Sequence, residues 1–206
     1  GQRAAVWKMR ILQYADSVTE GKLMLHSQLI TGASGGMIGA SYFRELYYRA
    51  QHNDLRNSHW SESYVDKISL DNLNPVLFSL VVSDLFLRIQ KTEFEGKYYY
   101  RDRGYALEDK LNQNMDLVMN KKLKAYESPE QSAEIPMIIM SPALINDGRK
   151  LYISPQPVSY MNRASSDFMA DEEPILKGVE FMRFFHDYGA ENLPMLTALR
   201  MNATFP

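Results

Sequence analysis

The stretch LITGASGGMIGA, residues 29–40, joins a strand-like segment to a helical one through a run of small residues. The apolar segment LMLHSQLIT, residues 23–31, has the length of a β-strand. From residue 37 to residue 50 the apolar side chains recur mostly at helical spacing, which indicates an amphipathic helix. Gly32 lies where the two patterns meet. The sequence therefore predicts a strand, a glycine turn and a helix in succession.

The turn itself, residues 32–36, reads Gly-Ala-Ser-Gly-Gly and matches the Gly-x-Ser-x-Gly pattern of a serine nucleophile on a sharp bend. Small residues on both sides of Ser34 would relieve crowding, and the backbone N–H of Gly35 would face a developing oxyanion at the positive end of the helix. A purely structural turn and a phosphate-binding loop are the alternatives. The glycine spacing fits neither a P-loop nor a dinucleotide site. We predict Ser34 as nucleophile and Gly35 as oxyanion donor.

A serine hydroxyl needs a base within hydrogen-bond reach to become a nucleophile. His186 is the histidine far enough downstream of Ser34 to follow an acid in the order serine, acid, histidine, and Asp147 in the turn Asn-Asp-Gly would be that acid. Chain order is the one argument for this triad, because Asp147 also suits a plain turn. His52 and His59 flank a polar loop, so they are expected at the surface, and their spacing does not predict a metal site.

The remaining patterns place helices and strands in alternation along one domain, residues 1–206, without repeats or long linkers. This order favours an α/β or α+β layer architecture, with Ser34 at the carboxyl end of a central strand. The expected elements are a helix or strand over residues 3–14, helices over 74–88 and 105–125, a hairpin around the turn at 146–148, and short helices over 179–188 and 192–201.

Composition excludes several classes of function. The chain has 23 Lys and Arg against 25 Asp and Glu, a formal charge of -2, so it lacks the basic excess typical of nucleic-acid binding. It has no cysteine, which rules out disulfides, thiolate catalysis and cysteine-ligated zinc. The apolar residues 76–87 include Asp84 and fall short of the roughly 20 residues that a membrane span needs. The first residues show no signal-peptide pattern, and the cellular location stays open.

Three stretches resemble bacterial patatin-like phospholipases: GASGGMIGASYFREL at residues 32–46, RDRGYALEDKLNQNM at 101–115 and LPMLTALRMNATFP at 193–206. The resemblance covers most of residues 23–206. It implies a three-layer α/β/α fold related to the α/β-hydrolases, and hydrolysis of lipid acyl esters by a Ser-Asp dyad without a metal or cofactor. Ser34 takes the nucleophile's place. The partners implied are a lipid or phospholipid ester and a membrane surface.

The chain departs from the family pattern in two places. The family's aspartate stands in Asp-Gly-Gly or Asp-Gly-Ala after the stretch that resembles residues 193–206, whereas the chain's Asp147-Gly148 precedes that stretch. The family's glycine-rich oxyanion loop precedes the serine, yet residues 1–28 contain only Gly1 and Gly21. The resemblance thus implies a domain truncated at both ends, with the aspartate after Pro206 and little activity in these residues alone.

Two other functions remain open beside the dyad hydrolase. One is a self-contained esterase that uses Ser34, Asp147 and His186. The other is a non-catalytic lipid-binding module on the same fold. In the dyad hydrolase, the helix expected over residues 76–87 could line an acyl groove or touch a membrane, although a buried core helix is the simpler expectation.

Overall fold

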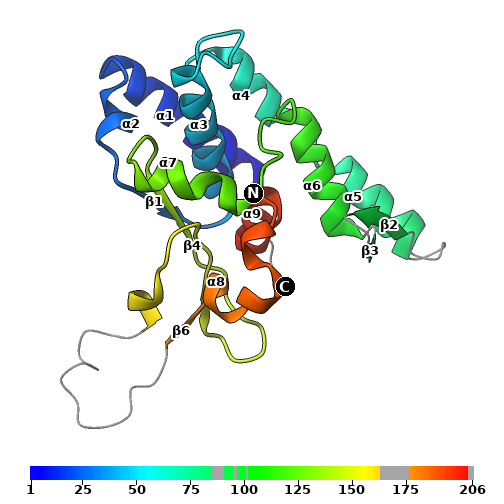
Figure 1. Cartoon of the computed structure of the whole chain (residues 1–206). Helices are drawn as coiled ribbons and strands as arrows, with labels where there is room; N and C mark the ends of the chain where they lie inside the picture. The colour runs from blue at the N-terminus through cyan, green and yellow to red at the C-terminus, as the bar shows by residue number, and fades with distance from the viewer. Residues whose placement is uncertain (85–90, 95–96, 101, 163–176, 204–206) are drawn as a thin grey trace, which may run out of the picture.

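The computed structural model of the chain describes residues 1–84, 91–94, 97–100, 102–162 and 177–203. Figure 1 shows a group of helices above a pair of strands, with further strands and a short helix below the pair. The upper helices are α1 (Gln2–Val18), α3 (Ser34–Gln51) and α4 (Glu62–Ser69), and the paired strands are β1 (Leu29–Gly32) and β4 (Met137–Met140). Below them lie β5 (Lys150–Tyr152), β6 (Gly178–Glu180) and α8 (Phe181–Phe184). The described chain therefore mixes helices with small sheets.

The strands pair in three separate sheets. β1 and β4 run parallel, with Leu29 opposite Met137 and Gly32 opposite Met140. β5 and β6 are also parallel, whereas β2 (Lys91–Phe94) and β3 (Lys97–Tyr100) form an antiparallel hairpin. In the part of the chain that the structure describes, β4 is the one partner of β1. The expectation of a central strand before Ser34 is wrong for these residues, because β1 lies at an edge.

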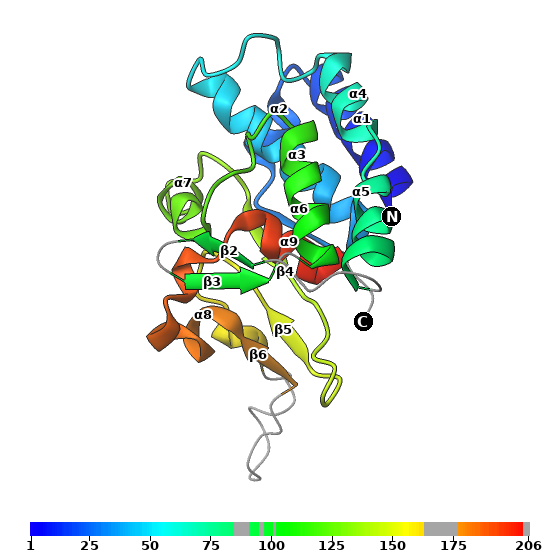
Figure 2. The ribbon, with the colours of Figure 1, turned by 90° about the vertical axis from the view of Figure 1, so that its right-hand side faces the viewer.

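The remaining elements are short except for two helices, α6 and α9. Their bounds are α2 (Lys22–His26), α5 (Asn74–Phe78), the π-helix η1 (Ser79–Asp84), α6 (Arg103–Asn114), η2 (Leu123–Tyr126), α7 (Glu127–Gln131), η3 (Ser159–Asn162), η5 (His186–Tyr188), η6 (Ala190–Asn192) and α9 (Met195–Ala203). α9 contacts α3, α6 and β4, so it lies beside the carboxyl ends of β1 and β4. Figure 2 shows α1, α4 and α5 along one edge of the molecule, next to the N-terminus.

The order strand, turn, helix around Ser34 is confirmed, but the strand is shorter than predicted. Residues 22–26 form α2, and β1 begins at Leu29. The reason is tertiary: Gly21 turns the chain in the left-handed conformation (φ 82°), and the buried Asp16 carboxylate accepts the N–H of Met24 at 2.9 Å. That bond fixes the segment next to α1, so an extended conformation is not available to it.

Three other predicted elements change their length or type. The helix expected over 105–125 ends at Asn114, because Asp116 and Leu117 take left-handed conformations (φ 54° and 61°) and Leu123 N–H donates to Leu193 O at 2.9 Å. The helix expected over 74–88 is α5 followed by η1, and residues 85–88 lie outside the described chain. The first two residues of the helix expected over 179–188 belong instead to the strand β6.

The hairpin predicted around residues 146–148 is confirmed. Met140 and Ile153 exchange two backbone hydrogen bonds of 2.9 Å each, and Leu144 N–H donates to Arg149 O across the turn at 2.8 Å. Residues 3–14, expected to form a helix or a strand, lie within the helix α1.

Helices α1 and α3 approach each other closely at glycine. A Cβ atom on Gly39 would lie 2.2 Å from Ala5 O, and one on Gly35 would lie 2.0 Å from Gly1 O. Real Cβ atoms do not come so near a backbone oxygen, so both positions require glycine unless α1 moves. The contact buries Ala5, Met9 and the inner face of α3.

A buried ion pair lies in the core beside α3. The Arg44 guanidinium contacts the Glu130 carboxylate through Nη2 and Oε1, and both side chains are almost fully buried. The Arg44 guanidinium also lies 4.9 Å from the centre of the Tyr126 ring. Burial raises the pKa of Glu130 from 4.5 to about 7, although Arg44 opposes the shift. The pair joins α3 to α7, which are 86 residues apart in the sequence at this contact.

We predict that Gly39→Ala destabilises the protein and that Gly36→Ala does not. The new methyl group at residue 39 meets the α1 backbone, and overpacking of this kind costs about 1–3 kcal/mol of unfolding free energy. A Cβ on Gly36 meets nothing within 4 Å, and alanine is the better helix former by roughly 1 kcal/mol. Urea unfolding of both variants measures the difference. Equal effects would contradict the close α1–α3 contact.

We predict that Glu130 makes stability depend on pH. Its folded pKa lies above its ordinary value, so the folded protein holds the proton more tightly, and ionisation between pH 4.5 and about 7 destabilises the fold. The unfolding free energy of the wild type relative to Glu130→Gln should therefore fall as pH rises through this range, by at most about 1.4 kcal/mol per pH unit. A difference that stays constant across the range would contradict the raised pKa.

Candidate functional site

Ser34 stands at a sharp bend between β1 and α3. Ala33 before it is extended (φ -133°, ψ 159°), and Ser34 itself is in the left-handed region with φ 55°. This conformation costs a residue with a Cβ atom about 1–3 kcal/mol, and such strain concentrates at functional sites. The 18-residue helix α3 begins at Ser34, so the hydroxyl lies at the positive end of the helix dipole. The bend therefore has the strand, turn and helix order that the Gly-x-Ser-x-Gly pattern predicts.

The start of α1 lies across this bend. The Gly1 nitrogen donates to Ser34 Oγ at 3.3 Å, and the Gln2 amide donates to the carbonyl oxygens of Ser69 and Leu70 at 2.8 and 2.5 Å. Ser34 is half-buried as a result, and Gly35 is buried in the first turn of α3. Sequence reasoning missed the proximity of Gly1 to Ser34.

A second element reaches the bend from the opposite end of the chain. The Asn202 side chain of α9 donates from Nδ2 to Gly32 O at 3.0 Å and accepts the Ser141 N–H with Oδ1 at 3.2 Å. It thereby connects the last residue of β1 with the residue after β4. Sequence reasoning missed this asparagine too, although it lies within the stretch at 193–206.

The structure does not bring Asp147 and His186 to the serine. The Asp147 carboxylate accepts the backbone N–H of Arg149 at 3.0 Å and its Nε–H at 2.7 Å, and these bonds lower the pKa of Asp147. The His186 side chain is 84% exposed, and its Nδ1 lies 3.3 Å from Asp187 Oδ1. Within the described residues, neither group has a bond to Ser34, so this geometry does not support the triad.

The expectation that His59 lies at the surface is wrong. Its side chain is 13% exposed and its Nε2 lies 3.2 Å from Oδ2 of the buried Asp16. The same carboxylate accepts Trp60 Nε1–H at 2.9 Å, in addition to the N–H of Met24. This group connects the 58–61 loop to α1 and α2, which is a structural role. Among the described residues, no three His, Asp or Glu side chains gather as a metal ion would require.

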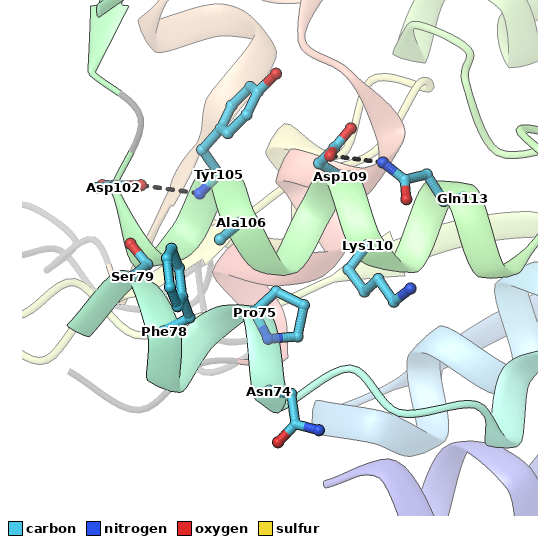
Figure 3. A pocket seen from close by; sticks show the side chains of 10 residues that line it. All are labelled: Asn74, Pro75, Phe78, Ser79, Asp102, Tyr105, Ala106, Asp109, Lys110 and Gln113. Atoms are coloured by element: carbon cyan, nitrogen blue, oxygen red, sulfur yellow. Dashed lines mark hydrogen bonds between the residues drawn. The ribbon is translucent and has the colours of Figure 1, made fainter. Parts of the chain in front are cut away.

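Two grooves open on the surface, and Ser34 lines neither. One, of about 540 Å³, runs between α5 and α6. Figure 3 shows Pro75 and Phe78 on one helix, and Ala106 and Lys110 on the other. The second groove, of about 690 Å³, lies between α1 and α4 and includes the exposed Trp7.

The segment at 70–81 exposes a row of apolar side chains. They are Leu70, Leu73, Leu77, Phe78 and Val81. Phe78 is 66% exposed, so the expectation of a buried core helix is wrong for this part of residues 76–87. No helix in the described chain is long and apolar enough to cross a bilayer.

Comparison with family models, curated proteins and solved structures finds no match to this chain. We therefore infer the function from the geometry around Ser34.

Proposed function

We propose that this chain carries the nucleophile of a serine acyl hydrolase that cleaves lipid esters. The observation that supports it is the conformation of Ser34, a non-glycine residue with φ 55° at the junction of β1 and α3. A serine there bears a backbone strain that glycine would avoid. Asp116 and Leu117 are also left-handed, just after the end of α6, so the backbone angle alone does not distinguish Ser34. What distinguishes it is its place between a strand and an 18-residue helix, where a nucleophile's oxygen stands at the positive end of the helix dipole.

Chemically, Ser34 Oγ attacks the acyl carbon of the ester while a general base takes the hydroxyl proton. The carbonyl oxygen becomes an oxyanion, which the Gly35 N–H and the α3 dipole stabilise. Collapse of this intermediate breaks the acyl C–O bond, and the leaving alcohol takes the proton. Water then hydrolyses the acyl-serine by the same steps. The resemblance assigns the base to an aspartate, and we assign it to no described residue.

Lipid as the substrate class, and a patatin-like three-layer fold, are supported by the three stretches that resemble this family. The exposed apolar row from Leu70 to Val81 agrees with a lipid substrate. The row begins at Leu70. The carbonyl oxygens of Ser69 and Leu70 accept the Gln2 amide, and Gln2 follows Gly1, which contacts Ser34. A substrate presented by a membrane would thus meet apolar side chains close to the bend.

We predict that a fluorophosphonate modifies Ser34 when the general base is present, and that Ser34→Ala removes the modification. Fluorophosphonates react with serines made nucleophilic by their surroundings, and mass spectrometry of the modified peptide identifies the residue. Asp147→Ala and His186→Ala should leave the labelling rate within about twofold of the wild type, because neither side chain contacts the serine.

Each alternative function has its own outcome in this experiment. Loss of labelling in His186→Ala would support the triad. Absence of labelling in residues 1–206 alone would agree with a base outside them, as the resemblance implies, whereas absence in a longer chain that includes the aspartate would contradict the hydrolase and favour a non-catalytic lipid-binding module.

We also predict that Val81→Asp weakens binding to phospholipid vesicles, because it places a charge among exposed apolar side chains. A suitable control is Ile145→Asp, since Ile145 is 76% exposed at the tip of the β4–β5 hairpin. Sedimentation with vesicles measures both variants, and circular dichroism verifies the fold. Equal binding by wild type and Val81→Asp would remove the membrane contact from the proposal and leave the serine chemistry untouched.

A further inference from the structure

One buried amide holds the carboxyl ends of β1 and β4 together. Asn202 is 9% exposed, and its Nδ2 and Oδ1 bond the Gly32 carbonyl and the Ser141 N–H. The orientation of the amide is fixed by its partners, because a carbonyl requires the NH₂ group and an N–H requires the oxygen. A side chain that only donates, or only accepts, cannot make both bonds.

The two bonds lie where the chain leaves the sheet for the bend. Gly32 and Met140 are the last residues of their strands and stand opposite each other in the parallel register. Gly32 is two residues before Ser34, and Ser141 directly follows Met140. Because β1 has one strand partner in the described chain, its last carbonyl depends on Asn202 for a further anchor.

The helix that carries Asn202 is itself firmly placed. The Glu108 carboxylate of α6 accepts the Thr197 hydroxyl at 2.8 Å and contacts Arg200 Nε, so one acid joins α6 to two turns of α9. Ala198 and Leu199, which stand between Thr197 and Arg200 in the sequence, are buried in the core. α9 therefore brings the amide to the strand ends from a fixed position.

We propose that Asn202 is a positioning residue for the Ser34 nucleophile, which it serves by holding the Gly32 carbonyl at the start of the bend. A residue at φ 55° keeps its conformation only where its surroundings fix it, and Gly32 and α3 are its two flanking anchors. Loss of one anchor lets Ser34 Oγ leave the line of attack. The inference rests on the proposed function of Ser34, but the hold on the backbone can be measured without it.

The experiment compares Asn202→Ala and Asn202→Asp with a matched control, Asn114→Ala. Asn114 is also a buried asparagine, 6% exposed, and its Nδ2 bonds Asn72 Oδ1 at 2.9 Å and lies 3.3 Å from Asp71 O, away from the bend. We expect similar losses of Tm in both alanine variants. Only Asn202→Ala should slow fluorophosphonate labelling of Ser34, by about tenfold to a hundredfold, the size of effect expected when a reacting group is misplaced.

Asn202→Asp gives a pH signature that a merely structural role does not. The aspartate keeps an acceptor for Ser141 but, when ionised, repels the Gly32 carbonyl instead of donating to it. A protonated aspartate can donate again. The labelling rate of Asn202→Asp relative to the wild type should therefore rise as pH falls, while the ratio for Asn202→Ala stays flat.

Hydrogen exchange of peptides covering residues 29–36 and 137–142 measures the positioning independently of chemistry. Faster exchange there in Asn202→Ala, but not in Asn114→Ala, is the expected result. Unchanged exchange and unchanged labelling in Asn202→Ala would overturn the proposal while the hydrolase stands. If Ser34 is not labelled even when the general base is present, the proposed function fails, and the exchange data alone then support or overturn the hold on Gly32.

Discussion

The close approach of α1 to α3 at Gly35 and Gly39 is the constraint on which the rest of the molecule depends. It lets the backbone of residues 1–5 lie directly on α3, and so brings the start of α1 next to Ser34. α1 also contacts the segment before α4, because Gln13 of α1 donates to the carbonyls of His59 and Ser61. Gly35 and Gly39 are needed because a side chain at either position would meet the backbone of residues 1–5.

Buried charges in this molecule connect segments that are far apart in the sequence. Asp16 holds the 58–61 loop and the start of α2, Arg44 and Glu130 join α3 to α7, and Glu45 pairs with Arg49 and Lys121. Each carboxylate loses its hydration on burial and recovers part of the cost through these partners. Such groups add less to the unfolding free energy than apolar packing does, but they restrict which segments can meet.

Contacts from distant parts of the sequence hold the bend at Ser34 in the same way. The bend is held on one side by the residues that open α1 and on the other by the amide of Asn202, while Asp147 and His186 stay on exposed loops. A serine, a helix start and a strained backbone are therefore assembled, and the described residues do not identify a base. Chain order suggested a triad, yet order places residues along the chain and not in space.

What the sequence by itself determined is local: the strand, turn and helix about Ser34, and the hairpin around residues 146–148. Periodicity and turn residues suffice there because the deciding contacts lie within a few residues. Tertiary structure alone decided that residues 22–26 form a helix, that α6 ends at Asn114, that His59 packs against the buried Asp16, and that Asn202 reaches Gly32. Those outcomes depend on partners 8 to 170 residues away, and no pattern of neighbouring side chains carries that information.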